Sequence, residues 1–160
     1  MSTQPTLEQR LDMIESRAAI QDLVISYAHG HDRHDIDLLM SVWHDDAEYL
    51  MGDLFGDYRG LQEIRHACEG VIWKHVPETW HFTTNLLLKV DGDHASAIAL
   101  CDCHGTEVNG RAIVLACTYH DDYERRVGRW AIARRRLEFH YITGWQQGWG
   151  LGKENHFRAA

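Results

Sequence analysis

Apolar residues recur at helical spacing through the first part of the chain. Leu7, Leu11 and Ile14 fall three or four positions apart, and a second group with the same spacing follows: Ile20, Leu23, Val24 and Tyr27. Side chains at this spacing share one face of an α-helix, so the pattern predicts helix. Ser16 is a candidate N-cap for a second helix that runs to about Arg33.

The pattern changes before the middle of the chain. Asp35–His44 predicts a third helix, whose acidic first turn suits the helix dipole, and Ala47–Met51 predicts a short strand. Three glycines then punctuate a loop or hairpin between residues 52 and 60. Leu61–His75 predicts an amphipathic helix, which Pro77 ends.

The rest of the chain predicts a run of antiparallel strands. Three turn signals divide it: Asp91-Gly92-Asp93, Asn109-Gly110 and Val127-Gly128. The strands expected around these turns are His81–Val90, His94–Glu107, Arg111–Arg125 and Arg129–Thr143. The Gly-rich segment after residue 143 is expected to pack loosely or against a neighbouring subunit.

This order of elements predicts the fold class. Helices come first and antiparallel hairpins follow, which is the plan of an α+β protein rather than of a repeating βαβ unit. The length of 160 residues suits one domain, and no linker or internal repeat divides it, so we expect a single domain over residues 1–160. Long strands that curl around packed helices would enclose one concave pocket, which is the default ligand site.

Charge and composition argue against several classes of function. The net charge is -8, so a nucleic-acid binder, which needs a basic surface, is not expected. No apolar run is long enough to span a membrane, and the acidic charge also disfavours binding to an anionic membrane surface. The N-terminal segment is polar and lacks the features of a signal peptide, so the expected location is the cytoplasm.

Cysteine and histidine spacing leaves little room for a metal site. The four cysteines lack a zinc-binding pattern, and in a cytoplasmic protein we expect them to be reduced and mostly buried. Among twelve histidines, His31 lies four residues before Asp35, with His34 beside them, a spacing that can hold a metal on one helix face. A helix that ends near residue 33 would scatter these side chains, so we expect a solvated helix end and no metal.

Four segments resemble a known family. RAAIQDLVISYAHGHDRHD, WHDDAEY, TWHFTTNL and DDYERRVGRWAIARR are similar to SnoaL-like proteins of the superfamily that includes nuclear transport factor 2 and ketosteroid isomerase. The resemblance covers roughly residues 10–145. It implies a cystatin-like α+β barrel: a cone-shaped, curved, mostly antiparallel sheet wrapped around N-terminal helices. Within the family the chain resembles hexachlorocyclohexane dehydrochlorinase, bile-acid dehydratase and the more distant scytalone dehydratase.

The resemblance also implies catalytic residues. These enzymes share an aspartate that orients a histidine base, and the matching positions are Asp32 and His81. Five residues before the aspartate the dehydrochlorinase has lysine and the bile-acid dehydratase has tyrosine; Tyr27 stands there in this chain, which favours an oxygen leaving group over chloride. Histidine suits the role of base because its unperturbed pKa is about 6.5.

Four further residues are candidates for substrate binding. Arg135 matches an arginine in the final hairpin of the dehydrochlorinase, and Asp102 and His104 lie near a polar position of the dehydratases. Trp43 is a candidate wall of the pocket. Each candidate has a structural alternative: a helix-end or surface aspartate, a hydrogen-bonded structural histidine, a core aromatic residue or a solvated arginine.

The function expected from these residues is that of a cofactor-independent lyase, a dehydratase that removes water from a hydrophobic hydroxylated substrate such as a steroid or polyketide-like compound. Alternatives that keep the same Asp–His pair are an isomerase or cyclase and a dehydrohalogenase. An alternative from another class is a non-catalytic binding module, like the small subunit of a ring-hydroxylating dioxygenase. By resemblance the chain is expected to form a homo-oligomer, a trimer.

Overall fold

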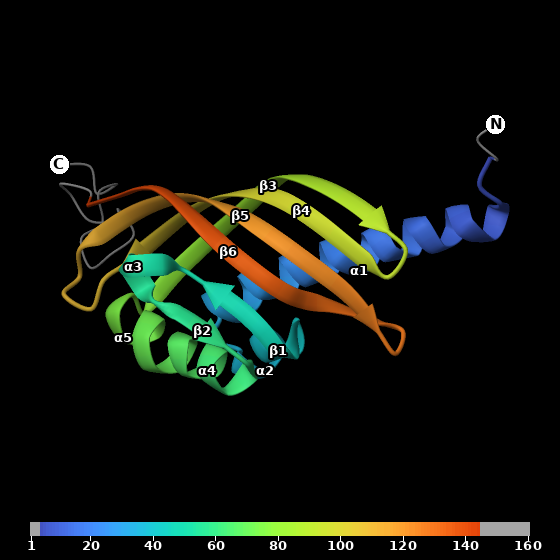
Figure 1. Cartoon of the computed structure of the whole chain (residues 1–160). Coiled ribbons are helices and arrows are strands. Elements are labelled where there is room, and N and C mark those ends of the chain that lie inside the picture. Colours follow the sequence, from blue (N-terminus) through green and yellow to red (C-terminus); the bar gives the residue numbers. More distant parts are fainter. Residues whose placement is uncertain (1–3, 145–160) are drawn as a thin grey trace.

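The computed structural model describes residues 4–144, which form an α+β fold (Figure 1). A long N-terminal helix packs on one face of a curved, open sheet, and shorter helices lie beside it below the same face (Figure 1). The helices are α1 (Leu7–Asp32), α2 (Ile36–Ser41), α3 (Gly52–Phe55), α4 (Leu61–His66), the π-helix η1 (Ala67–Ile72) and α5 (Trp73–His75). The strands are β1 (Trp43–Leu50), β2 (Asp57–Arg59), β3 (Glu78–Asp91), β4 (His94–Thr106), β5 (Ala112–Arg126) and β6 (Arg129–Gly144).

The predicted α+β class and the mostly antiparallel sheet are confirmed. The strand order is β2-β1-β6-β5-β4-β3, and of these neighbouring pairs only β1–β6 is parallel. The sheet stays open at its edges, so it is a curved layer rather than a closed barrel.

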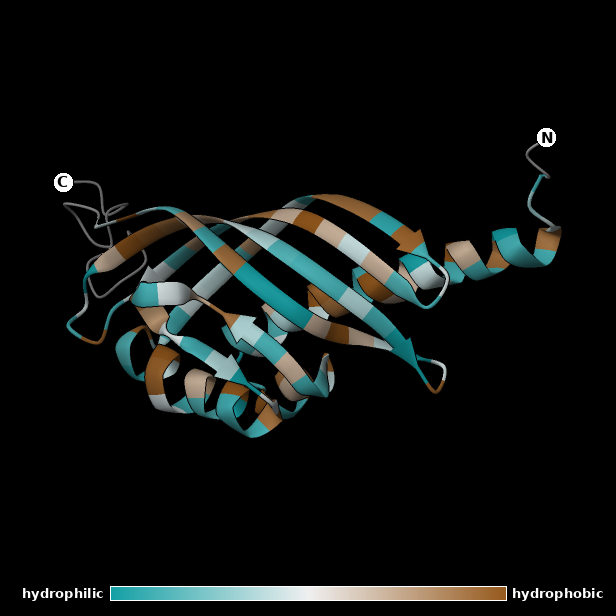
Figure 2. Cartoon of the chain, in the orientation of Figure 1, coloured by the Kyte–Doolittle hydropathy of each residue, from teal (hydrophilic) through white to brown (hydrophobic). Residues whose placement is uncertain are grey.

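Alternation along the strands determines which side chains face the helices. In β4 the small residues Ala95, Ala97, Ala99, Cys101 and Cys103 are buried, and the residues between them are more exposed. Figure 2 shows that hydrophilic and hydrophobic residues are interspersed along the strands. Small side chains on the inner face leave space between the sheet and the helices, and Cys103 lines a cavity there.

The first helix differs from the prediction of two helices. α1 runs unbroken for 26 residues, and Thr6, not Ser16, caps it through a capping box with Gln9. Ser16 is buried within the helix and accepts a hydrogen bond from Arg125. The helix ends where Gly30 packs against α2: a Cβ at Gly30 would lie 2.8 Å from the Cβ of Leu39.

Three other predicted elements also differ from the structure. The predicted helix Asp35–His44 ends at Ser41, because the chain turns at Val42 and enters β1. The predicted helix Leu61–His75 is present, but as three consecutive segments with a π turn in the middle. The first long strand begins at Glu78, three residues earlier than predicted, and this extension brings it beside the end of α1.

The three predicted hairpin turns are confirmed. Gly92 and Gly110 adopt positive φ in their turns, and the Val127-Gly128 turn has φ of 52° and 77°, as a two-residue turn between twisted strands requires. The predictions for residues 145–160 lie outside the described residues.

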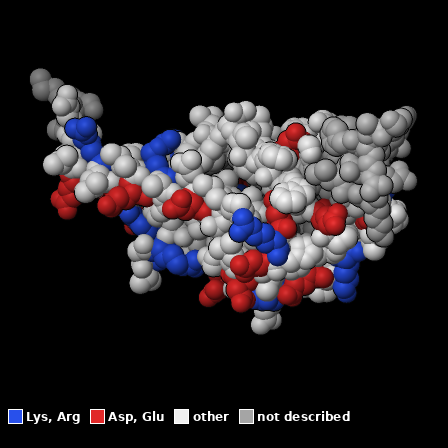
Figure 3. Space-filling view, turned by 180° about the vertical axis from the view of Figure 1, so that it is seen from behind, with Lys and Arg blue, Asp and Glu red and all other residues white. Residues whose placement is uncertain are grey.

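Surface charge is mixed. Figure 3 shows Lys and Arg side chains interspersed with Asp and Glu over the face that it presents.

None of the helices within residues 4–144 combines the length and the apolar character needed to cross a membrane. The four cysteines are buried and free.

Candidate functional site

An aspartate and a histidine meet where the end of α1 lies against the start of β3. The Nδ1 atom of His81 is 2.6 Å from Oδ1 of Asp32, and the same oxygen accepts a hydrogen bond of 2.9 Å from Oγ1 of Thr79. The other carboxylate oxygen accepts a hydrogen bond of 2.9 Å from the backbone N–H of His81. These bonds fix the carboxylate, and the carboxylate fixes the imidazole ring.

Asp32 and His81 shift each other's protonation. Burial raises the pKa of the Asp32 carboxyl, but the hydrogen bonds from His81 and Thr79 outweigh burial, so the pKa lies below its usual value. Burial lowers the pKa of His81; Cys103, which pairs with it across the β3–β4 ladder, and Asp32 raise it, so the net pKa lies well above its usual value. A carboxylate at Nδ1 holds the proton there, which leaves Nε2 of the neutral ring as the basic atom.

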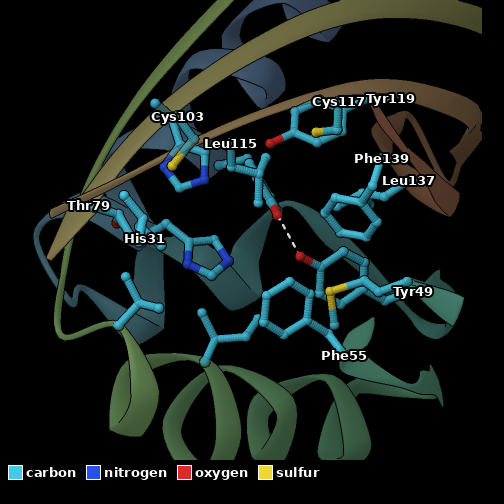
Figure 4. Close-up of a pocket in the computed structure, with 17 residues that line it drawn as sticks. His31, Tyr49, Phe55, Thr79, Cys103, Leu115, Cys117, Tyr119, Leu137 and Phe139 are labelled. Carbon is cyan, nitrogen blue, oxygen red and sulfur yellow. Dashed lines mark hydrogen bonds between the residues drawn. The ribbon is translucent and has the colours of Figure 1, made fainter. Parts of the chain in front are cut away.

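His81 lines a cavity between the sheet and the helices. Figure 4 shows side chains converging on this space from both layers. The cavity has a volume of about 70 Å³. Its lining is mainly apolar and consists of Tyr27, His31, Tyr49, Met51, Phe55, Ile72, Val76, Thr79, His81, Cys103, Gly105, Ile113, Leu115, Cys117, Tyr119, Leu137 and Phe139.

Two tyrosine hydroxyls form a second polar feature of the cavity. The hydroxyl oxygens of Tyr27 and Tyr49 are 2.7 Å apart (dashed line in Figure 4). Burial raises the pKa of both phenols, so both remain protonated near neutral pH. The two hydroxyls carry two protons. One forms the hydrogen bond between them, and the other can be donated to a ligand.

A buried arginine, Arg135, packs against the ring of Tyr27. The Arg135 guanidinium lies between the rings of Tyr27 and Tyr119, 4.1 Å and 4.2 Å from their centroids, and donates two hydrogen bonds to Asp121. Its side chain is fully buried. Arg135 thus lies behind the cavity wall and is absent from the cavity lining. The prediction that it contacts substrate directly is corrected: its guanidinium packs against the ring of Tyr27 instead.

Two of the other predicted binding residues lie on the wrong face. Asp102 and His104 alternate with the inward-facing Cys101 and Cys103 on β4, and they form an ion pair at 3.6 Å on the outer face of the sheet. The prediction that Asp102 and His104 contact substrate is therefore wrong, because successive side chains of a strand point to opposite faces of the sheet. Trp43 is a core residue that packs edge-on against Tyr27 and does not line the cavity.

Sequence reasoning missed other residues of the site. Tyr49, Cys103 and His31 line the cavity, but only His31 carried a signal: it stands four positions after Tyr27, on the same face of α1. His31 does not combine with Asp35, because Asp35 caps α2 through the backbone N–H of Leu38. Within residues 4–144 no group of three or more His, Cys, Asp or Glu side chains is arranged to hold a metal ion.

The arrangement is suited to general acid–base chemistry. It offers one oriented imidazole base, a carboxylate that stabilises the imidazolium formed from it, and neutral hydroxyl donors in a mainly apolar cavity. Such groups can remove a proton bound to carbon and stabilise negative charge that develops on a neighbouring oxygen.

Comparisons with known proteins identify the family of the chain. The SnoaL-like domain family matches residues 12–136. Hexachlorocyclohexane dehydrochlorinase 1 of Sphingobium indicum is 36% identical over 135 residues, which cover 83% of this chain and 87% of that protein.

Solved structures extend the comparison. The crystal structure of the dehydrochlorinase LinA matches with a TM-score of 0.82 and 34% identity, covering 86% of this chain and 94% of that one. A protein assigned provisionally as a scytalone dehydratase, from Novosphingobium aromaticivorans, matches with a TM-score of 0.74 over 93% of this chain and 97% of that one. At 20% identity, this second likeness shows the fold alone.

Proposed function

The chain belongs to the SnoaL-like domain family, and from that premise we propose that it is a cofactor-independent lyase that removes water from a hydrophobic alcohol. The observation that carries the proposal is the bond of 2.6 Å between Asp32 and His81 at the wall of an apolar cavity. The similar dehydrochlorinases are themselves enzymes named for an elimination, which supports lyase chemistry.

The first step uses His81 as the base. Its Nε2 takes a proton from a substrate carbon, and the electron pair left by that C–H bond forms the new double bond once the C–O bond on the neighbouring carbon breaks. Asp32 stabilises the resulting imidazolium. General acid–base help of this kind contributes about 10²–10⁴-fold to rate.

The second requirement is help for the leaving group, and the tyrosine pair supplies it. Hydroxide is a poor leaving group, so the departing oxygen needs a hydrogen-bond donor and finally a proton. Tyr27, held by Tyr49 and by the guanidinium of Arg135, donates the hydrogen bond. The proton collected by His81 leaves with the oxygen as water, which restores the enzyme.

The lining of the cavity favours a hydrophobic substrate, because aromatic and aliphatic side chains such as Phe55, Leu137 and Phe139 form much of its wall. A second candidate function is removal of halide by the same base. The 36% identity to a dehydrochlorinase favours it, whereas a halide needs no proton from a tyrosine to depart.

Turnover of paired substrates distinguishes the two. Purified protein is incubated separately with 3-hydroxycyclohexanone and with hexachlorocyclohexane, and the products are measured as enone absorbance and as released chloride. We expect enone from the hydroxyketone, lost in the His81→Ala variant and retained in a His75→Ala control, whose imidazole is exposed. Chloride release alone would replace the dehydratase with the dehalogenating alternative, and no product from either would refute the lyase.

We also propose that the chain forms a homotrimer through the outer face of its sheet. Large apolar side chains are exposed there on neighbouring strands β3 and β4: Trp80, Phe82, Leu87, Ile98 and Leu100. Burial of such a patch against another copy removes apolar surface from water. Sedimentation analysis should give three times the chain mass, and Leu100→Asp should lower it; a monomeric wild-type protein would contradict the proposal.

A further inference from the structure

A second histidine faces the cavity without a hydrogen-bond partner at one of its nitrogens. His31 lies on α1, is 2% exposed and belongs to the cavity lining, and Figure 4 shows its ring there. Its Nδ1 atom is buried and has no partner among the described residues. A buried nitrogen without a hydrogen-bond partner destabilises the site, so the site gains when a ligand pairs with this atom.

The neighbour of the other ring nitrogen indicates where the proton sits. Sγ of Cys68 lies 3.9 Å from Nε2 of His31. Burial raises the pKa of the Cys68 thiol to about 12, so the thiol keeps its proton. An S–H group is a weak donor, and the pairing in which this thiol donates to Nε2 places the ring proton of His31 on Nδ1.

His31 remains neutral in this position. Burial lowers its pKa well below the usual value, and His81 and Arg135 lower it further, although Asp32 acts in the opposite direction. A neutral imidazole with its proton on Nδ1 is a hydrogen-bond donor without a positive charge. It therefore does not attract the Asp32 carboxylate away from His81. The group that fits it is a hydrogen-bond acceptor on the substrate.

The acceptor would lie next to the reacting carbon. The ring centroid of His31 is 5.3 Å from that of His81 and 4.9 Å from that of Tyr27. An oxygen bound to His31 and a carbon facing His81 therefore belong to the same small part of one molecule. A carbonyl group meets this requirement, because it accepts hydrogen bonds and its neighbouring carbon carries the acidic proton.

We propose that His31 is a further catalytic residue, whose Nδ1–H donates a hydrogen bond to a substrate carbonyl beside the carbon that gives its proton to His81. This inference rests on the proposed elimination and narrows the substrate class to β-hydroxy carbonyl compounds. As His81 removes the proton, negative charge moves to the carbonyl oxygen, where His31 stabilises it; the C–O bond then breaks and the pair returns to form the conjugated double bond. Neutral imidazole is known to act as such an electrophile.

Binding of unreactive ligands tests the hydrogen bond without any turnover. Cyclohexanone and methylenecyclohexane differ only in the exchange of oxygen for a CH₂ group, and neither has a leaving group. Their affinities are measured by NMR titration for the wild type, for His31→Leu, for His31→Asn, which keeps a polar amide near the Nδ1 position, and for His29→Leu, an exposed control on the same helix.

We expect His31→Leu to weaken cyclohexanone binding about 3- to 10-fold and to leave methylenecyclohexane unchanged, as the loss of one hydrogen bond predicts. His31→Asn should restore most of the affinity for the ketone, and His29→Leu should alter neither ligand. Equal losses for both ligands would overturn the proposal, because they would indicate a packing role for His31.

The wild-type protein provides two further readouts. The ¹³C resonance of the bound cyclohexanone carbonyl should move downfield relative to its position in an apolar solvent, and the ¹⁵N spectrum of His31 should show the proton on Nδ1. A proton on Nε2 would overturn the proposal even if the leucine variant fails to fold. Ketone-selective binding without elimination of water would refute the proposed function and retain His31 as a carbonyl-binding residue.

Discussion

Replacement of Asp32 by asparagine tests the orientation of the base most sharply. The carboxylate accepts three hydrogen bonds: from Oγ1 of Thr79, from Nδ1 of His81 and from the backbone N–H of His81. Asparagine has one oxygen and one NH₂ group, so it cannot accept all three. If its oxygen faces Nδ1, the NH₂ group opposes the backbone N–H; if the oxygen faces the backbone, the NH₂ group donates to Nδ1.

The second orientation avoids a clash of donors and is therefore the expected one. It moves the ring proton of His81 to Nε2 and removes the lone pair that acts as the base. The expected loss in kcat/KM is the whole contribution of the base, about 10²–10⁴-fold or about 3–5 kcal/mol. Loss of one hydrogen bond to a charged acceptor should also lower the free energy of unfolding by about 1.5–3 kcal/mol.

The assay measures enone formation from 3-hydroxycyclohexanone by Asp32→Asn and by Asp22→Asn, an exposed aspartate on the same helix. Urea unfolding establishes that both variants are folded at the assay temperature. Wild-type rates in Asp32→Asn would refute the reasoning, because they would show that the carboxylate does not determine the protonation of His81.

Four further predictions concern the leaving group, the two effects of pH and the packing of α1. Tyr27→Phe should lower enone formation more than tenfold, since the departing oxygen loses its donor, but should leave exchange of the substrate's carbon-bound proton with D₂O within about threefold, as measured by NMR. The kcat/KM of the wild type should rise with pH through a pKa above 6.5, because His81 must be neutral to act; a profile that falls through this range would contradict that. The raised pKa of His81 stabilises the fold below the unfolded value of about 6.5, so this contribution should be lost as pH rises through the folded pKa, as thermal melts against His81→Gln would show. Gly30→Ala should reduce the free energy of unfolding in urea by about 1–2 kcal/mol, because the added Cβ would lie 2.8 Å from the Leu39 Cβ and overpacking outweighs the gain in helix propensity; equal or greater stability would refute this.

The fold was largely predictable because its signals are local. Hydrophobic periodicity located the helical first part, and the Asn109-Gly110 and Val127-Gly128 turns located the long hairpins. The boundaries were less predictable: Ser16 has the chemistry of a cap but lies buried in α1, where packing against Arg125 overrides local preference. The start of β3 at Glu78 depends on pairing with β4, which no local pattern encodes.

The site was predictable only in part, since its residues come from distant parts of the chain. Asp32 and His81 followed from the family resemblance, and the structure brings them to 2.6 Å. Asp102 and His104 point outward because side chains alternate between the two faces of β4. An error of one residue in aligning the sequence with the strand exchanges the inward and outward residues. Tyr49 joins Tyr27 only because β1 lies beside β6 in the folded sheet, a contact that sequence spacing does not reveal.

Exchange of the α-protons of cyclohexanone with D₂O is the most direct test of the central claim, since it requires the base and no leaving group. The wild-type protein should incorporate deuterium into the ketone, as followed by NMR, and His75→Ala should do so at the same rate, because that imidazole is exposed and lies outside the cavity lining. His81→Ala should reduce the catalysed rate about 10²-fold or more. Equal exchange rates for the wild type and His81→Ala would show that this imidazole does not remove the proton.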